Sequence, residues 1–255
     1  MPGPADAFAL GTGPDACLLL HGLTGSPAEM RPLGEALAKA GLRAISPLLP
    51  GHGTTPGDLE FVSRGDLLDA ARGALLSLQG ARHIYLCGLS AGALLAIHLA
   101  AKSWLREGLP ELQAVAFLAP AIQFSGSSWA FANLVGRLPA LPLLIEKGAR
   151  DIRGARPDAD AAYAQVPWRW GAELRALSEE ALKRAHRVRA PALILQGALD
   201  RTTAPAGARK LARELASRDV ELRILPLSGH VLPLDQESAE VCSSVVSFFQ
   251  KHGGS

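Results

Sequence analysis

The sequence has few cysteines, and their arrangement argues against a disulfide framework. Cys17, Cys87 and Cys242 are odd in number, far apart, and within or beside apolar segments. Such a pattern favours buried free thiols in a reducing compartment, so we expect a cytoplasmic protein. A catalytic role for Cys87 is disfavoured, because it falls inside an expected strand and not at an exposed strand end.

Long hydrophobic runs and an excess of one charge are also lacking. The net charge is +2 over 255 residues and the arginines are scattered, so we expect no nucleic-acid partner. No apolar stretch approaches the ~20 residues of a membrane span. The N-terminus lacks the basic and apolar segments of a signal peptide. With 48% hydrophobic residues, the chain is expected to be globular with a substantial core.

Motifs for metals and cofactors are missing as well. No pair of histidines has metal-ligand spacing, and HExxH does not occur. The glycine-rich loops lack both GxGxxG and the lysine of a P-loop. We therefore predict that the protein uses neither a metal nor a nucleotide cofactor.

Short apolar segments alternate with helical patterns along the chain, which is typical of a parallel sheet covered on both faces. Expected strands are Ala16–Leu20, Leu42–Ser46, His83–Cys87, Ala114–Leu118, Ala192–Gln196 and Leu222–Leu225. Expected helices are Ala28–Ala40, Arg64–Leu78, Ala91–Leu105, Ala206–Ser217 and Gln236–Gln250. The fold class is therefore α/β.

Residues 121–188 interrupt this alternation, since connections in such folds usually have ~2–6 residues. We predict that they form an inserted cap, and that residues 1–120 and 189–255 form the core. Aromatic and apolar residues gather in the insert, namely Phe124, Trp129, Phe131, Trp168, Trp170 and the run Leu138 to Ile145. Each could simply pack the cap onto the sheet, but together they suggest the wall of an apolar pocket.

Gly88-Leu89-Ser90-Ala91-Gly92 lies between an expected strand and an expected helix. A serine with glycine two positions before and after it, at a strand-to-helix turn, is typical of the nucleophile elbow of the α/β-hydrolase fold. Small residues are needed there because strand and helix nearly touch. Ser90 is therefore the candidate nucleophile.

A serine nucleophile needs a base, which in this fold is a histidine that follows the acid in the chain. Of the seven histidines, His230 and His252 follow a suitable acid, and His252 lies in a terminal tail. His230 follows an expected strand in a loop, from which it can reach a neighbouring strand end. We take His230 as the base.

Asp200 is the best candidate for the acid, because it directly follows a buried expected strand. Asp219 and Asp235 are the alternatives. Asp219 precedes a strand and should lie at the opposite edge of the sheet, whereas Asp235 fits better as the cap of the last helix. The order Ser90, Asp200, His230 then matches that of the fold.

An oxyanion hole requires two N–H donors. The first donor in this fold is the amide after the nucleophile, here Ala91, and the second comes from the loop after an earlier strand, here Leu23 in His21-Gly22-Leu23-Thr24-Gly25. His21 precedes the serine, so we interpret it as structural, bonding to loop backbone. His52, in Leu49-Pro50-Gly51-His52-Gly53, is expected to hold a loop in place.

Together, these segments resemble the bacterial carboxylesterase and monoacylglycerol lipase family of α/β-hydrolases. The resemblance rests on Leu18 to Pro27 with Glu29-Met30-Arg31, Pro50-Gly51-His52-Gly53, Gly88-Leu89-Ser90, Gln196-Gly197 with Asp200, and Ser228-Gly229-His230-Val231 with Leu234-Asp235. It implies an α/β-hydrolase fold with a small cap inserted after strand 6, over an apolar acyl tunnel. Ala91-Gly92-Ala93 replaces the family's usual Met-Gly-Gly, and Leu23 stands where phenylalanine is common.

We therefore expect a serine hydrolase that cleaves esters with an apolar acyl group, short- to medium-chain esters or monoacylglycerols, through an acyl-enzyme on Ser90. A thioesterase, a lactonase and a carbon–carbon bond hydrolase share the same three residues and remain alternatives. A non-catalytic ligand-binding relative is disfavoured because no member of the triad is missing. The sequence does not indicate an oligomeric state.

Overall fold

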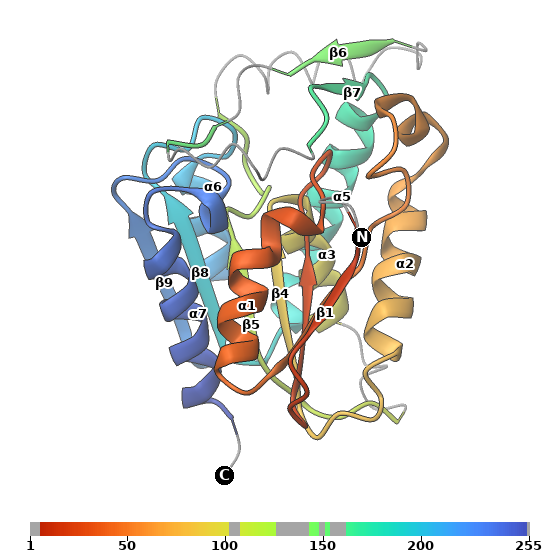
Figure 1. Ribbon diagram of the computed structural model, residues 1–255. Coiled ribbons are helices and arrows are strands. Elements are labelled where there is room, and N and C mark those ends of the chain that lie inside the picture. The colour runs from red at the N-terminus through yellow and green to blue at the C-terminus, as the bar shows by residue number, and fades with distance from the viewer. Residues whose placement is uncertain (1–5, 102–107, 126–142, 148–150, 154–161, 254–255) are drawn as a thin grey trace.

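The computed structural model describes residues 6–101, 108–125, 143–147, 151–153 and 162–253. Its centre is a seven-stranded sheet with the order β1-β3-β2-β4-β5-β8-β9 (Figure 1). The strands are β1 (Phe8–Leu10), β2 (Ala16–Leu20), β3 (Arg43–Ser46), β4 (Ile84–Leu89), β5 (Leu112–Leu118), β8 (Ala192–Gly197) and β9 (Val220–Leu225). Neighbouring strands are parallel except for β1, which runs antiparallel to β3.

The central strands are apolar along their whole length because both faces of the sheet are covered. Every residue of β2, β4 and β8 is buried. Side chains alternate between the two faces, so Leu18 and Leu20 join one hydrophobic core while Cys17 and Leu19 join the other. The apolar runs therefore predicted these strands, even though they show no polar alternation.

Helices cover both faces of the sheet (Figure 1). One face carries α1 (Arg31–Lys39) and α7 (Ser238–Lys251), and the other carries α2 (Arg64–Leu76), α3 (Ala91–Ala100), α5 (Trp170–Arg184) and α6 (Pro205–Glu214). Short 3-10 helices in the described residues are η1 (Pro27–Met30), η2 (Pro56–Phe61), η5 (Ala185–Arg187) and η6 (Leu232–Leu234). The predicted layered α/β architecture is confirmed.

Two elements of the sheet layers were not expected from the sequence. The edge strand β1 has three residues, too few to show a period. Helix α5 lies within the stretch assigned to the cap, yet Trp170 and Leu177 are buried in the same core as α3. Its apolar residues contact the helices beneath it, so the helix contributes to the core on this face.

The same stretch also contains a two-stranded antiparallel sheet of β6 (Leu144–Glu146) and β7 (Gln165–Pro167). It lies beyond the carboxyl ends of the parallel strands, at the top of Figure 1. Trp129 and Phe131, two of the aromatic residues predicted to wall a pocket, lie outside the described residues. The division into core and cap stays a prediction.

Two further expectations concern the cysteines and membrane-spanning segments. Cys17, Cys87 and Cys242 are all buried, and none of them forms a disulfide bond. Among the helices that the structure describes, none is long and apolar enough to cross a membrane.

Candidate active site

Ser90 occupies a sharp turn between β4 and α3. Its backbone has φ 56° and ψ −113°, a conformation that residues other than glycine rarely adopt. The turn is held by the Ser90 amide, which donates to the carbonyl of Leu118 on β5 over 2.8 Å. The side chain is therefore presented at the carboxyl end of β4, directly before the first residue of α3.

Both glycines of the elbow are required by close backbone contacts. A Cβ atom at Gly88 would lie 2.2 Å from the carbonyl oxygen of Gly92, so strand and helix do nearly touch. A Cβ atom at Gly92 would lie 2.1 Å from the carbonyl oxygen of Leu20. The second glycine thus accommodates the neighbouring strand β2, a contact that the motif alone did not indicate.

The structure brings His230 to Ser90 from 140 residues away in the chain. His230 lies in the loop after β9, and its Nε2 is 2.9 Å from Ser90 Oγ. Its Nδ1 is 2.9 Å from Oδ2 of Asp200, which lies in the loop after β8. A carboxylate only accepts, so Nδ1 carries the proton and Nε2 is free to accept from the serine hydroxyl.

Asp200 is buried and surrounded by donors. Its Oδ2 accepts from Gln196 Nε2 at 2.8 Å and from Thr203 Oγ1 at 2.7 Å, and Oδ1 accepts from the amides of Thr202 and Thr203. Burial raises the pKa of Asp200, but the charge and hydrogen bond of His230 and the bonds from Thr203 outweigh burial and lower the pKa. The carboxylate is therefore ionised and fixed in orientation.

The two alternative acids lie elsewhere. Asp219 precedes β9 and is 3.0 Å from Lys251 Nζ and 3.3 Å from His252 Nε2. Asp235 accepts from the amide of Gly229 at 2.7 Å, so it supports the loop of the candidate base. The expectation that Asp235 caps the last helix is wrong, because the residue preceding α7 is Glu237.

The loop after β2 lies against the elbow, as expected for an oxyanion loop. A Cβ atom at Gly22 would be 3.5 Å from Ser90 Cβ, which places Leu23 beside the nucleophile. Ala91 begins α3, where amides have no partner within the helix. Within the described part of the chain, neither the Leu23 nor the Ala91 amide donates to a protein acceptor.

Two buried neutral histidines hold this loop. His21 accepts at Nε2 from the amide of Leu49, and its Nδ1 lies 2.9 Å from the carbonyl of Gly22. His52 accepts at Nε2 from the amide of Thr24 at 3.0 Å. Burial, assisted by the neighbouring His52, lowers the pKa of His21 to about 3, and burial also lowers the pKa of His52. Both rings bond to loop backbone, as predicted.

Several residues near the site were missed by the sequence reasoning. Thr203 could have been found, because a threonine three residues after an aspartate often bonds back to it. Lys147, Asp151 and Tyr163 had no such signal. They come from the inserted stretch, and they contact the site only through tertiary packing.

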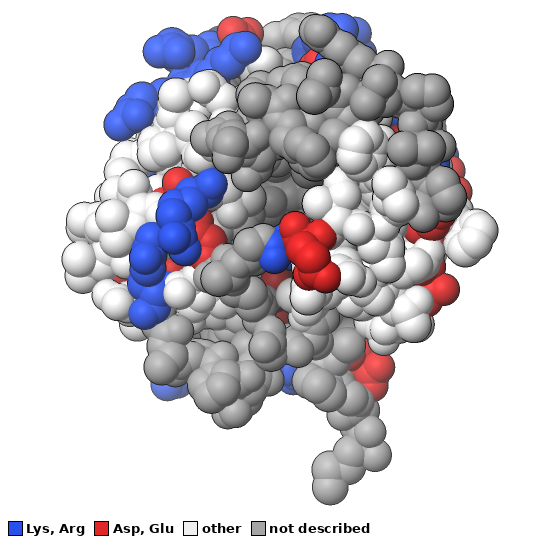
Figure 2. All heavy atoms as spheres, turned by 90° about the horizontal axis from the view of Figure 1, so that it is seen from above, with Lys and Arg blue, Asp and Glu red and all other residues white. Residues whose placement is uncertain are grey.

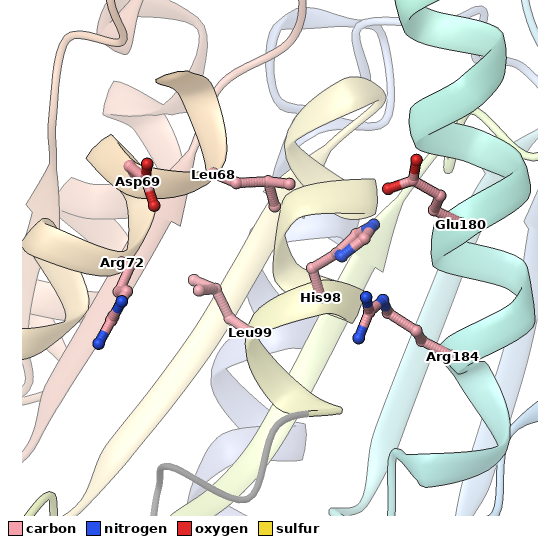
Figure 3. A pocket seen from close by; sticks show the side chains of 7 residues that line it. All are labelled: Leu68, Asp69, Arg72, His98, Leu99, Glu180 and Arg184. Carbon is pink, nitrogen blue, oxygen red and sulfur yellow. The ribbon is translucent and has the colours of Figure 1, made fainter. Parts of the chain in front are cut away.

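The face at the carboxyl ends of the strands is hollowed near its centre, and uncharged residues cover much of the described surface beside the hollow (Figure 2). A separate cavity of about 90 Å³ lies between α2, α3 and α5 (Figure 3). Its lining includes His98, Glu180 and Arg184 but none of the three residues of the candidate triad. This cavity is therefore distinct from the site at Ser90.

Comparison with known proteins identifies the family. Residues 14–237 match the family model described as serine aminopeptidase, S33. The chain belongs to this family. The matched residues include the elbow, the loop after β2, Asp200 and His230, so the family's match covers the whole candidate site. The α/β-hydrolase fold predicted from the motifs is confirmed.

The proteins that are similar to this chain include lipases and esterases. A thermostable monoacylglycerol lipase of Bacillus sp. (strain H-257) is 30% identical, covering 98% of this chain and 96% of the relative. A carboxylesterase of Bacillus subtilis is 24% identical, over 96% of each chain. A solved structure of metagenome-derived lipolytic enzymes has a TM-score of 0.88 and 26% identity, covering 98% of both chains. The predicted resemblance to carboxylesterases and monoacylglycerol lipases is confirmed.

Proposed function

We propose that this protein is a serine ester hydrolase with Ser90 as nucleophile, His230 as general base and Asp200 as the acid that orients it. The observation that carries the proposal is the unbroken chain of hydrogen bonds from Ser90 Oγ to His230 Nε2 and from His230 Nδ1 to Asp200, each 2.9 Å long. Nucleophile, base and orienting carboxylate in this geometry are the parts that acyl transfer requires.

The reaction would proceed in two halves. His230 Nε2 takes the proton of Ser90 as Oγ attacks the ester carbonyl, and His230 then gives that proton to the leaving alcohol. His230 Nε2 then takes a proton from water as the water attacks the acyl-enzyme, and returns that proton to Ser90 Oγ as the bond to the acyl group breaks and the carboxylic acid leaves. In both halves the carbonyl oxygen becomes negative, and the amides of Leu23 and Ala91 donate to it, aided by the N-terminal end of the α3 dipole.

Asp200 would act by orientation and charge. It fixes the proton on Nδ1, so Nε2 faces the serine, and it stabilises the imidazolium that forms during attack. Gln196 and Thr203 donate to the same carboxylate and hold it towards His230. All of these steps use side chains and amides of this chain.

For the substrate, we propose small esters with an apolar acyl group, either short- to medium-chain esters or monoacylglycerols. The names of the relatives from Bacillus species support this class. The apolar residues of the inserted stretch would then contact the acyl chain, as a cap formed by residues 121–188 over the core. Thioesters and lactones are alternative substrates for the same three residues.

We also propose that the protein works in the cytoplasm. Cys17 and Cys87 are buried in the neighbouring strands β2 and β4, where Cys17 pairs with Tyr85 and Cys87 pairs with Leu19. Burial raises the pKa of both thiols, so they stay protonated and unreactive. Free thiols of this kind fit a reducing compartment.

The test is a panel of p-nitrophenyl esters with acyl chains of two to sixteen carbons, together with monoacylglycerols, a thioester, a lactone and an aminoacyl amide. We expect turnover of esters in the wild type, loss of turnover in Ser90→Ala, and covalent labelling of Ser90 by a fluorophosphonate probe. Ser243→Ala, a change at an exposed serine of α7, is the matched control. Turnover that persists in Ser90→Ala, or a faster reaction with the amide than with any ester, contradicts the proposal.

A further inference from the structure

We infer that the inserted β6–β7 sheet holds the oxyanion loop in its reactive shape, with Lys147 as a positioning residue that acts through Thr24. The inference rests on the proposed function of Leu23 as an oxyanion donor. It assigns a role in the reaction to a segment far from the triad in the chain.

Thr24, which directly follows Leu23, has φ 65°. This left-handed conformation is unfavourable for a β-branched residue, and such an outlier persists only where its surroundings hold it. Thr24 is also buried, so water does not satisfy its polar groups. Neighbouring segments must therefore supply the bonds that keep this conformation.

All three polar groups of Thr24 are bonded, each to a different segment. The amide donates to Nε2 of His52 at 3.0 Å. The carbonyl accepts from the amide of Tyr163 at 2.8 Å. The hydroxyl oxygen accepts from Nζ of Lys147. Two of the three partners thus belong to the inserted stretch, one directly after β6 and one shortly before β7.

These partners are themselves fixed. Lys147 Nζ also contacts the carbonyl of Tyr163 at 3.3 Å, and the Lys147 amide donates to the carbonyl of Ala164. The Tyr163 hydroxyl donates to the carbonyl of Gly51 at 3.0 Å and accepts from the amide of Thr54 at 2.8 Å. Tyr163 therefore ties the inserted sheet to the loop that carries His52.

The charge of Lys147 reinforces the arrangement. His52 can accept from Thr24 only while its ring is neutral, because a protonated imidazole has no acceptor nitrogen. Burial lowers the pKa of His52, and the nearby ammonium of Lys147 lowers it further. Lys147 thus bonds to Thr24 directly and also favours the form of His52 that bonds to the same residue.

The bonds of Thr24 affect the proposed oxyanion donor, the amide of Leu23. The Leu23 N–H belongs to the peptide group that directly precedes the Leu23–Thr24 peptide group, so the bonds that hold Thr24 fix one end of Leu23 and limit how far its N–H can turn. A donor aimed at the developing oxyanion stabilises the transition state more than the bound ester. Loosening Thr24 should therefore lower kcat and leave KM nearly unchanged.

The experiment compares Lys147→Met, Thr24→Val and the double variant, with Lys147→Arg as the conservative change. Lys251→Met, at an exposed lysine that binds Asp219, is the matched control. We measure kcat and KM for a p-nitrophenyl ester, the rate of labelling by a fluorophosphonate, and Tm. Thr24→Ser, which keeps the hydroxyl, is the conservative change at this position, and Lys147→Met alone removes the bond if Thr24→Val fails to fold.

We expect each single variant to lower kcat and the labelling rate about tenfold, with KM changed less than about twofold. The double variant should lose no more than the worse single variant, because both remove the same bond. Lys147→Arg and Thr24→Ser should recover most of the rate. Unchanged rates in the single variants, additive losses in the double variant, or a loss as large in Lys251→Met would overturn the inference.

The labelling rate separates this inference from the proposed function. Fluorophosphonates need an activated serine and an oxyanion hole but no particular ester. A wild type that is labelled yet hydrolyses no ester disproves the proposed function, and the variants still test the role of Lys147. A wild type that hydrolyses esters, with variants that match it in both rates, disproves the inference alone.

Discussion

The backbone carbonyl of Asp151 accepts a hydrogen bond from the amide of His230 at 2.8 Å. The carboxylate of the same residue accepts from the amide of Arg201, next to Asp200. A Cβ atom at Gly229 would lie 2.7 Å from the Asp151 carbonyl oxygen, so glycine is needed for this approach. One residue of the inserted stretch thus connects the loops that carry the candidate acid and base.

We predict that Asp151→Ala lowers stability by about 1–3 kcal/mol and lowers kcat, because the amide of Arg201 loses its buried acceptor. Asp151→Asn keeps an acceptor oxygen and should lose less of both. Chemical denaturation and ester kinetics measure the two effects, with Asp69→Ala on the exposed side of α2 as control. An Asn variant as damaged as the Ala variant would show that the charge, not the hydrogen bond, matters.

A second prediction tests whether Asp200 is the acid that orients His230. Asp200→Asn should lower kcat about 10³- to 10⁴-fold, because the amide no longer fixes the tautomer of His230. Asp219→Asn is the matched control, since its carboxylate binds Lys251 and should change kcat less than twofold. Steady-state kinetics on one ester decide between them, and a larger loss in Asp219→Asn would reject Asp200 as the acid.

A third prediction concerns the elbow glycines. Gly92→Ala should destabilise the fold by about 3 kcal/mol or more, because its Cβ would meet the backbone of β2. Gly73→Ala, at an exposed position of α2 with nothing within 4 Å of the new Cβ, should instead stabilise by about 0.5–1 kcal/mol. Thermal denaturation of both variants tests the contrast. Equal Tm values would mean that the elbow relaxes around an added methyl group.

The buried histidines predict acid sensitivity. Burial and the neighbouring His52 lower the pKa of His21 to about 3 from 6.5. As pH falls below 6.5, the unfolded chain therefore binds a proton that the folded chain does not, and the free energy of unfolding decreases. The loss approaches about 1.4 kcal/mol per pH unit for such a group, until the folded state also protonates.

Urea denaturation between pH 7.5 and 5 measures this slope. His52 contributes in the same direction, because burial lowers its pKa as well. His21→Asn should be less stable at pH 7.5 but show a flatter slope, whereas His186→Asn, at an exposed position, should keep the wild-type slope. The same slope in His21→Asn and the wild type would contradict the prediction.

The central strands and the elbow could be read from the sequence because their signals are local. Apolar runs predicted β2, β4 and β8, and the expected bounds of β2 agree with the structure residue for residue. The short edge strand β1 could not be read in this way, since it forms only by pairing with β3. Helix α5 was hidden in the inserted stretch, because its apolar face is defined by its contact with α3.

The sequence by itself predicted the candidate nucleophile, its partners and their order, because each sits at a strand end in a parallel sheet, and such ends meet at one edge. Tertiary structure decided what surrounds them. The roles of Thr203, Lys147 and Asp151 depend on hydrogen bonds within or between loops, and the bonds of Lys147 and Asp151 span from 50 to 123 residues of chain. No local pattern records such contacts, because they arise only when the strands have brought the loops together.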